Sequence, residues 1–193
     1  MKIVWVGAGA LGSYGILFTR NVEGLVKVID FDVVEKKNLD SQNYTRRDVG
    51  KGKAISTSRN LMGNYSKQAT GTPTKLDESN VEALLSGADL VVDAVDNVKT
   101  RRAIQAFVRA NNVPCVHGAL SAGGVFGVVM WDDVFEPDAE SEEGAPTCED
   151  GDHLAFITLV SSVLARAITE FARSGVRNSY YISPHKVTRV QSA

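Results

Sequence analysis

A glycine-rich turn directly after the first apolar run is the feature that most constrains how this chain can fold. Residues 3–6 are apolar and predict a β-strand, and glycines follow in a G-x-G-x-x-G pattern. In such a turn the first glycine permits the bend, the second lets backbone approach a phosphate, and the third lets the following helix pack closely on the strand. The residues expected to line a nucleotide here are Gly7, Ala8, Gly9, Leu11 and Gly12.

The surroundings of this turn match what the motif requires. An amphipathic segment over residues 10–20 predicts the first helix, and residues 25–30 predict a second strand that ends in Asp30. An acidic residue at the end of the second strand, roughly 20 residues beyond the turn, is where ribose hydroxyls are held in dinucleotide-binding folds. We therefore predict nucleotide binding.

The rest of the chain continues to alternate strands with helices. This alternation predicts an α/β fold with a doubly wound, Rossmann-like sheet, mainly parallel and with antiparallel strands toward the C-terminus. The further expected helices cover residues 50–64, 80–85, 98–111 and 154–173, and the further expected strands cover residues 68–73, 89–93, 113–118, 124–131, 179–182 and 186–190.

Composition restricts the domain organisation and the partners. The 193 residues, 44% hydrophobic and 23% charged, suit one nucleotide-binding domain over residues 1–193. A net charge of −2 gives no support for nucleic-acid binding, and no apolar stretch approaches the roughly 20 residues of a membrane span. The two cysteines and the absence of a signal peptide favour a cytoplasmic protein with reduced thiols. Two cysteines are too few for a four-cysteine zinc site.

An acidic segment precedes the long helix near the C-terminus. Residues 131–153 carry ten acidic residues and no Lys or Arg, which predicts a long mobile connection. It is either a solvated linker or a loop that wraps a partner or gates the site. The helix at 154–173 is apolar on more than one face, which predicts burial beyond one sheet contact and a homodimer.

Two further clusters belong at the edge of the sheet where ligands bind in such folds. Asp93-x-x-Asp96-Asn97 ends the most apolar strand, and Lys53 lies near the start of the helix expected after Gly50. Asp96 suits a Mg²⁺ ion on phosphates, although Asp93 or Asp96 could instead cap the next helix. Lys53 could neutralise phosphates, or it is a solvated helix lysine.

These pieces together resemble the ubiquitin-activating-like adenylyltransferases, the family of the ThiF, MoeB and HesA proteins. The long apolar helix and the segment Pro146-Thr147-Cys148 before it also resemble that family's crossover loop and the helix behind it. The match covers nearly the whole chain, in order. The other matching segments are Gly7-Ala8-Gly9-Ala10-Leu11-Gly12-Ser13, Asp30-x-Asp32-x-Val34-x-x-x-Asn38-Leu39-x-x-Gln42, Gly50-Lys51-x-Lys53-Ala54 and Asp93-x-x-Asp96-Asn97-x-x-x-Arg101.

The resemblance implies a reaction in which a carboxylate attacks the α-phosphate of ATP and pyrophosphate leaves. The carboxylate is usually the C-terminal glycine of a ubiquitin-like or sulfur-carrier protein, and a small-molecule carboxylate is possible. The implied catalytic residues are Asp96, Lys53 and Cys148, with Asp96 holding Mg²⁺. Besides the glycine turn, the implied nucleotide-binding residues are Asp30, Asp32, Asn38, Gln42, Lys53, Asp96 and Asn97.

The chain departs from the family pattern at one charged position. The family has an Arg that stabilises phosphate charge where this chain has Ser41, and Arg46 or Arg47 could supply that charge instead. Cys148 stands where some relatives form a covalent link to the carrier, but its acidic neighbours favour an inert thiol. Cys115 is expected to be a buried strand residue.

Two alternatives to adenylation remain at this point. An NAD-dependent oxidoreductase shares the glycine turn and Asp30, but it leaves the segment from Asn38 to Lys53 and the pair Asp96-Asn97 unexplained. A non-catalytic nucleotide-binding subunit of a heterodimer is kept open by Ser41.

Overall fold

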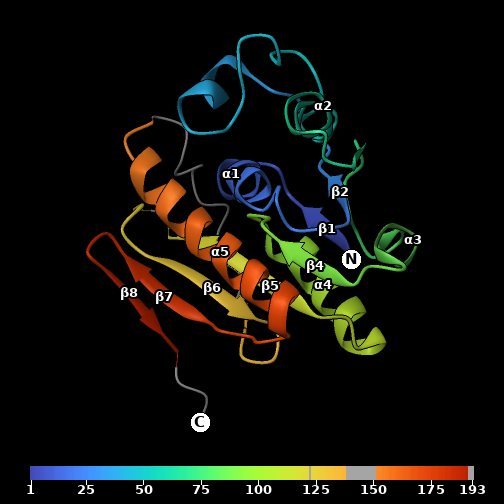
Figure 1. Cartoon of the computed structure of the whole chain (residues 1–193), viewed down its shortest axis with the longest axis vertical. Helices are drawn as coiled ribbons and strands as arrows, with labels where there is room; N and C mark the ends of the chain where they lie inside the picture. Colours follow the sequence, from blue (N-terminus) through green and yellow to red (C-terminus); the bar gives the residue numbers. More distant parts are fainter. Residues whose placement is uncertain (122, 138–150, 191–193) are drawn as a thin grey trace.

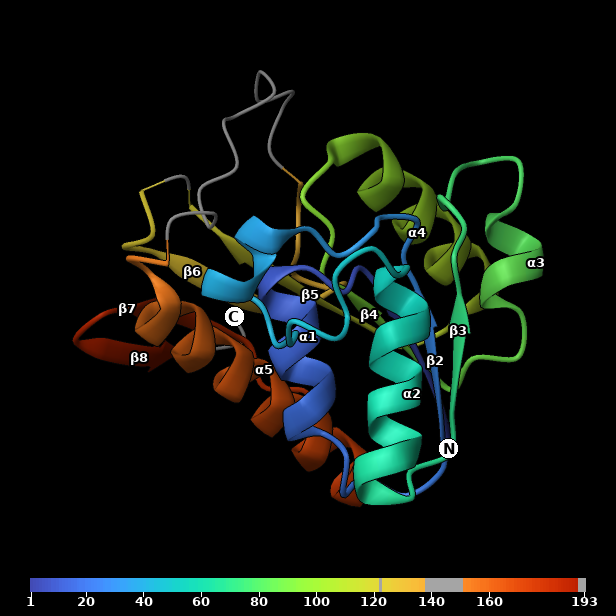
Figure 2. The same cartoon turned by 90° about the horizontal axis from the view of Figure 1, so that it is seen from above.

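The protein forms one eight-stranded mixed sheet with helices on both faces (Figures 1 and 2). This computed structural model describes residues 1–121, 123–137 and 151–190. The strands are β1 (Lys2–Val6), β2 (Leu25–Ile29), β3 (Ala69–Thr72), β4 (Leu90–Asp93), β5 (Cys115–Leu120), β6 (Gly127–Trp131), β7 (Tyr180–Ser183) and β8 (Lys186–Arg189). The helices are α1 (Ala10–Phe18), the short 3₁₀ helix η1 (Lys36–Asp40), α2 (Lys53–Tyr65), α3 (Val81–Leu85), α4 (Val98–Asn111) and α5 (Leu154–Ser174).

The strand order is β3-β2-β1-β4-β5-β6-β7-β8. The first five strands in this order are parallel, and β6, β7 and β8 continue the sheet antiparallel. The chain winds outward from β1 in one direction and then returns to β4 on the other side, so the strand order reverses between β1 and β4. Such a reversal opens a crevice beyond the strand ends. The fold predicted from the sequence is confirmed.

Strand β1 lies at the centre and contributes to the core on both faces of the sheet. Ile3 and Trp5 belong to one cluster with residues of α1 and α5, whereas Val4 and Val6 belong to a second cluster with residues of α4. This alternation follows from the two-residue period of a strand. Burial on both faces explains why β1 and β4 are apolar at almost every position.

Several predicted boundaries were wrong by a few residues. The helix expected from residue 50 begins at Lys53, because Gly50 has a φ of +84° and the Lys53 amide donates to the Asp32 carbonyl at 2.8 Å. The helix expected to end at residue 20 ends at Phe18. The strands expected at 113–118 and 124–131 occupy 115–120 and 127–131.

Helix α5 corrects the expectation that no apolar stretch approaches the length of a membrane span. It has 21 residues and a mean hydropathy of 1.6, enough to cross a membrane by length and composition. Its buried residues, however, join the main core against α1 and the sheet, among them Ile157, Leu164 and Ile168. A core helix buried in this way needs the same apolar composition. The apolar residues from which we predicted a homodimer are thus largely used within the chain.

Candidate nucleotide-binding site

Three predicted segments meet where the parallel strands β1, β2 and β4 end. The Gly7 amide donates to the Ile29 carbonyl at 2.9 Å, and the Ala94 amide donates to the Val6 carbonyl at 2.9 Å. These bonds hold the glycine turn between Asp30 on one side and residues 93–97 on the other. The edge of the sheet that we expected to bind ligands therefore carries all three segments.

The glycine turn is closed at two of its glycines and open at the third. Gly7 has a φ of +94°, and a Cβ atom there would lie 2.6 Å from the Ala94 carbonyl oxygen. A Cβ atom at Gly12 would lie 2.1 Å from the Gly7 oxygen, whereas one at Gly9 would meet nothing within 4 Å. Helix α1 begins at Ala10, so its first-turn amides have no intrahelical acceptor and attract an anion. Gly9 is thus the open side of the turn.

Asp30 binds the glycine turn itself. Its Oδ2 atom accepts the Ala8 amide at 2.6 Å, and its Oδ1 atom accepts the Asp32 amide at 2.8 Å. Burial raises the pKa of Asp30, although the two amides and Lys53 act in the opposite direction. The Ala8 carbonyl accepts the Tyr44 hydroxyl at 2.7 Å. The backbone amide and the backbone carbonyl of Ala8 are therefore both hydrogen-bonded within the protein. Ala8 shapes the turn and does not present a free amide.

Lys53 lies inside the site and pairs with a predicted site residue. Its Nζ atom lies 3.0 Å from Oδ2 of Asp32, and its side chain is 8% exposed against 48% for Asp32. The alternative that Lys53 is a solvated helix lysine is therefore wrong. A buried ammonium with one carboxylate partner keeps donors available for a second anion.

The segment between β2 and α2 lines the site with buried polar groups. Asn38 accepts the Glu35 amide at 2.8 Å through Oδ1 and caps η1. Ser41 and Gln42 are buried, and neither Ser41 Oγ nor Gln42 Oε1 has a hydrogen-bond partner among the residues that the structure describes. Buried polar atoms are nearly always paired with protein, water or a ligand. The Ser41 hydroxyl is thus available to donate or accept a hydrogen bond with a bound molecule, and Gln42 Oε1 is available to accept one.

Sequence reasoning missed the residues that hold this segment over the glycine turn. Besides contacting Ala8, the Tyr44 hydroxyl lies 3.1 Å from Thr57 Oγ1 on α2. Ser13 Oγ accepts the Asn43 amide at 3.0 Å. A single tyrosine in a polar connection gives no periodic signal that would have singled it out.

The residues after β4 divide into a cap and a free carboxylate. The Asn97 side chain accepts the Thr100 amide at 2.9 Å and caps α4. The capping role considered for Asp93 or Asp96 therefore belongs to Asn97. Asp96 is exposed and forms no hydrogen bond or ion pair with the described part of the chain.

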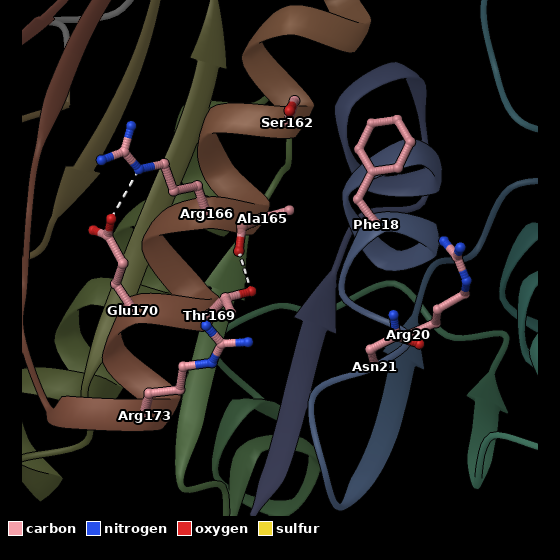
Figure 3. Close-up of a pocket in the computed structure, with 9 residues that line it drawn as sticks. All are labelled: Phe18, Arg20, Asn21, Ser162, Ala165, Arg166, Thr169, Glu170 and Arg173. Carbon is pink, nitrogen blue, oxygen red and sulfur yellow. Dashed lines mark hydrogen bonds and ion pairs between the residues drawn. The ribbon is translucent and has the colours of Figure 1, made fainter.

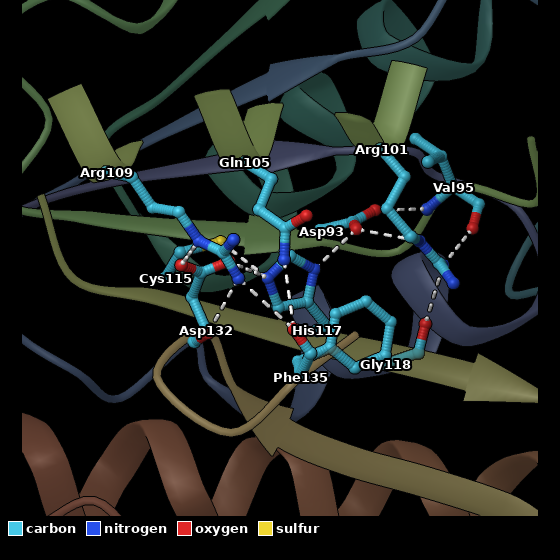
Figure 4. Close-up of polar contacts among 10 residues, drawn as sticks. All are labelled: Asp93, Val95, Arg101, Gln105, Arg109, Cys115, His117, Gly118, Asp132 and Phe135. Atoms are coloured by element: carbon cyan, nitrogen blue, oxygen red, sulfur yellow. Dashed lines mark hydrogen bonds and ion pairs between the residues drawn. The ribbon is translucent and has the colours of Figure 1, made fainter. Parts of the chain in front are cut away.

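Asp93 belongs to a buried network instead (Figure 4). Its Oδ2 atom lies 2.7 Å from His117 Nδ1 and 2.9 Å from Arg101 Nε. The other ring nitrogen of His117 lies 3.0 Å from Asp132 Oδ1. Burial lowers the pKa of His117, but Cys115 and hydrogen bonds to Asp132 and Asp93 outweigh it and raise the pKa to about 11. His117 is therefore protonated at neutral pH, between two carboxylates. Burial also raises the pKa of the neighbouring Cys115 thiol.

One further groove lies apart from this edge. A groove of about 520 Å³ at the end of α1 and along α5 contains none of the predicted site residues (Figure 3). Within residues 1–121, 123–137 and 151–190, no group of three His, Cys, Asp or Glu side chains could hold a metal ion. Cys148 lies outside the described residues, and Cys115 is buried as expected.

Comparisons with known proteins place this chain in a family. The sequence model of the ThiF family matches residues 1–179. The chain is 38% identical over 122 residues to the SAMP-activating enzyme E1 of Haloferax volcanii, a match that covers 62% of this chain and 45% of that protein. It is 36% identical over 135 residues to the sulfur carrier protein ThiS adenylyltransferase of Bacillus subtilis, covering 66% of this chain and 40% of that protein.

A solved structure gives the same fold. The crystal structure of E. coli MccB with ATP superposes with a TM-score of 0.77 at 16% identity, covering 98% of this chain and 63% of the MccB chain. The chain thus spans less than half the length of the two relatives and under two thirds of MccB. Because the family's sequence model matches nearly the whole chain, this protein belongs to the ThiF family.

Proposed function

We propose that this protein uses ATP to adenylate a carboxylate. A carboxylate oxygen attacks the α-phosphorus, the bond from that phosphorus to the pyrophosphate oxygen breaks, and an acyl adenylate and pyrophosphate form. The observation that carries the proposal is the convergence of the open glycine turn, Asp30 and Lys53 at one edge of the sheet. Two named relatives, the ThiS adenylyltransferase and a molybdopterin-synthase adenylyltransferase, support this activity over the dehydrogenase alternative.

The residues of the site suit a nucleoside triphosphate. The first-turn amides of α1 and the Lys53 ammonium supply positive charge for phosphates, and the space over Gly9 leaves room for them. Asp30 retains lone pairs for a ribose hydroxyl, and Gln42 Oε1 is a second acceptor. Nucleotidyl transfer depends mainly on such positioning and charge neutralisation.

Asp96 is the residue that would hold Mg²⁺. An exposed, unpaired carboxylate at a strand end suits a cation that favours one or two carboxylates beside phosphate oxygens. The ion would neutralise phosphate charge when it is bound with the nucleotide.

The proposed acceptor is the C-terminus of a ubiquitin-like or sulfur-carrier protein. Relatives named for activating SAMP and ThiS support this acceptor class, with a small-molecule carboxylate as the alternative. A homodimer in the cytoplasm completes the proposal. Light scattering at micromolar concentration tests the homodimer, and a monomer would contradict it.

A second candidate is a nucleotide-binding subunit without catalytic activity. Its specific support is Ser41, which is buried and uncharged where the resembling family has an Arg. Arg46 and Arg47 are exposed and are the nearest alternatives along the chain. If the protein is such a subunit, we expect it to bind ATP without turnover.

ATP–pyrophosphate exchange with purified carrier proteins separates the candidates. Adenylation of a carrier protein requires exchange that depends on the carrier and disappears with a carrier that lacks its C-terminal glycine, whereas adenylation of a small molecule requires exchange that depends on that carboxylate. Lys53→Ala should lower exchange on the order of 100-fold, whereas Lys51→Ala, at an exposed neighbouring lysine, should not. ATP binding without exchange for any carrier or small carboxylate would favour the non-catalytic subunit.

A further inference from the structure

Five charged side chains form a continuous series beside the proposed site, with alternating sign (Figure 4). The order is Arg101, Asp93, His117, Asp132 and Arg109, and we call this series the ion-pair chain. Its successive contacts are 2.9, 2.7, 3.0 and 2.8 Å long. Asp93 and His117 face each other because they are paired in the register of the parallel strands β4 and β5.

The centre of the ion-pair chain is sealed from solvent. The side chains of Asp93 and His117 are fully buried, and the His117 ring stacks on Phe135 with centroids 4.2 Å apart. Gln105 donates to the Phe135 carbonyl at 3.0 Å. Arg101, Gln105 and Arg109 are four residues apart on α4, so one stripe of that helix holds the whole arrangement.

The ion-pair chain does not have the chemistry of a catalytic triad. The Cys115 sulfur lies 3.6 Å from His117 Nε2, but both ring nitrogens of His117 already face carboxylates. An imidazolium that donates both protons has no lone pair with which to act as a base. Cys115 is also buried. His117 is thus a fixed cation and not an activator of a nucleophile.

The two ends of the ion-pair chain hold two different segments. On one side, Asp93 Oδ1 accepts the Val95 amide at 3.0 Å and Arg101 donates to the Val95 carbonyl at 2.5 Å, which fixes the turn that leads to Asp96. On the other side, Asp132 begins the segment that leaves β6.

We propose that His117 is a positioning residue that couples the turn at residues 94–96 to residues 132–135. Its cation joins the buried Asp93 carboxylate to the partly exposed Asp132 carboxylate, which would otherwise repel each other. Removing it loosens both segments together, and the turn that carries Asp96 then shifts away from the glycine turn. Only this last, catalytic consequence rests on the proposed function.

Hydrogen exchange tests the coupling without reference to activity. In His117→Gln, the amides of Val95 and Val134 should both exchange on the order of tenfold faster than in the wild type. Ile168→Val is the matched control, because it weakens the core on α5 without touching the ion-pair chain, and it should leave both amides protected. If His117→Gln affects neither amide, or only one, the coupling is refuted.

Asp132→Asn gives a second, milder probe, because the Asp132 side chain is 12% exposed and not fully buried. This substitution should also speed hydrogen exchange at the Val95 amide, although Asp132 follows β6 and Val95 follows β4. The double variant with His117→Gln should add little to either single effect, since both break one connection. Additive effects in the double variant would refute a single coupling element.

The catalytic consequence is read from the kinetics of pyrophosphate exchange. At a temperature where both variants are folded, His117→Gln should lower kcat on the order of tenfold and change KM for ATP little, whereas Ile168→Val should change neither. A variant with loosened amides and unchanged kcat would refute the positioning role. A wild-type protein without exchange activity would instead refute the proposed function, and the amide measurements would still test the coupling.

Discussion

Gly7 and Ala94 lie in contact across the end of the sheet, so close that no side chain fits between them. A Cβ atom on Gly7 would come within 2.6 Å of the Ala94 carbonyl oxygen and 2.9 Å of its carbonyl carbon. The glycine turn after β1 and the turn after β4 therefore form one surface. This contact determines how the backbone of the glycine turn lies relative to Asp96.

Gly7→Ala should destabilise the protein strongly. The substitution places a side chain at a φ of +94° and against the Ala94 carbonyl group. The backbone strain and the overpacking together should cost about 2–4 kcal/mol of unfolding free energy. Chemical denaturation measures this cost directly, and a loss below about 1 kcal/mol would mean that the two turns separate easily.

Gly9→Ala should lower the affinity for ATP and leave the stability of the protein nearly unchanged. Gly9 has a φ of −77° and open space at its Cβ position, so the unfolding free energy should change by less than about 1 kcal/mol. The added methyl group occupies the space that we assign to phosphate, so ATP affinity should fall on the order of tenfold or more. Calorimetric titration with ATP checks this, and unchanged affinity would move the phosphates elsewhere.

The sequence predicted the parts of the site whose requirements are local. The glycine turn and Asp30 could be predicted because a bend, a helix start and a strand end each have a short-range signature. The bond from Tyr44 to the Ala8 carbonyl joins residues 36 positions apart and follows no periodic pattern. The partnership of Asp93 with His117 depends on the register of two parallel strands, which a single sequence does not specify.

The sequence also did not predict which of several neighbouring residues with similar capping propensity caps α4. Asp93, Asp96 and Asn97 are all good helix caps, and only the geometry of the turn selects Asn97. The fold itself could be predicted, because alternating strands and helices allow few arrangements. The helix near the C-terminus was predicted at nearly its observed length, but its overall hydropathy was underestimated because polar residues on its outer face interrupt the apolar ones.

Asp96→Ala should remove activity without weakening the fold. Asp96 has no partner among the described residues, so its loss should leave the melting temperature unchanged, while pyrophosphate exchange falls on the order of 100-fold. Asp133→Ala, a second exposed carboxylate, is the matched control and should exchange normally. Asn97→Ala should instead lower the unfolding free energy by about 1 kcal/mol through the lost cap. An Asp96 variant that exchanges at the wild-type rate would defeat the proposed metal role.

The stability of the protein should fall as the pH rises above neutral, through His117. Folding raises the pKa of this residue from 6.5 to about 11, because Cys115 and the hydrogen bonds to Asp132 and Asp93 together outweigh the opposing effect of burial. A group with a raised pKa contributes stability that is fully present below its unfolded pKa and is lost toward its folded pKa. Between pH 7 and pH 10 the unfolding free energy should therefore decline by about 1.4 kcal/mol per pH unit from this one proton.

His117→Gln isolates that contribution. Asp93 and Asp132 have lowered pKa values, so their own contributions are lost only as the pH falls through the acid range and stay constant from pH 7 to pH 10. Groups that titrate elsewhere in the protein are common to both forms and cancel in the comparison. The variant should start less stable at pH 7, and the difference from the wild type should shrink steadily toward pH 10. The unfolding free energy of each form is measured by chemical denaturation at each pH. A difference between the two forms that stays constant from pH 7 to pH 10 would mean that His117 is not held as a cation between the two carboxylates.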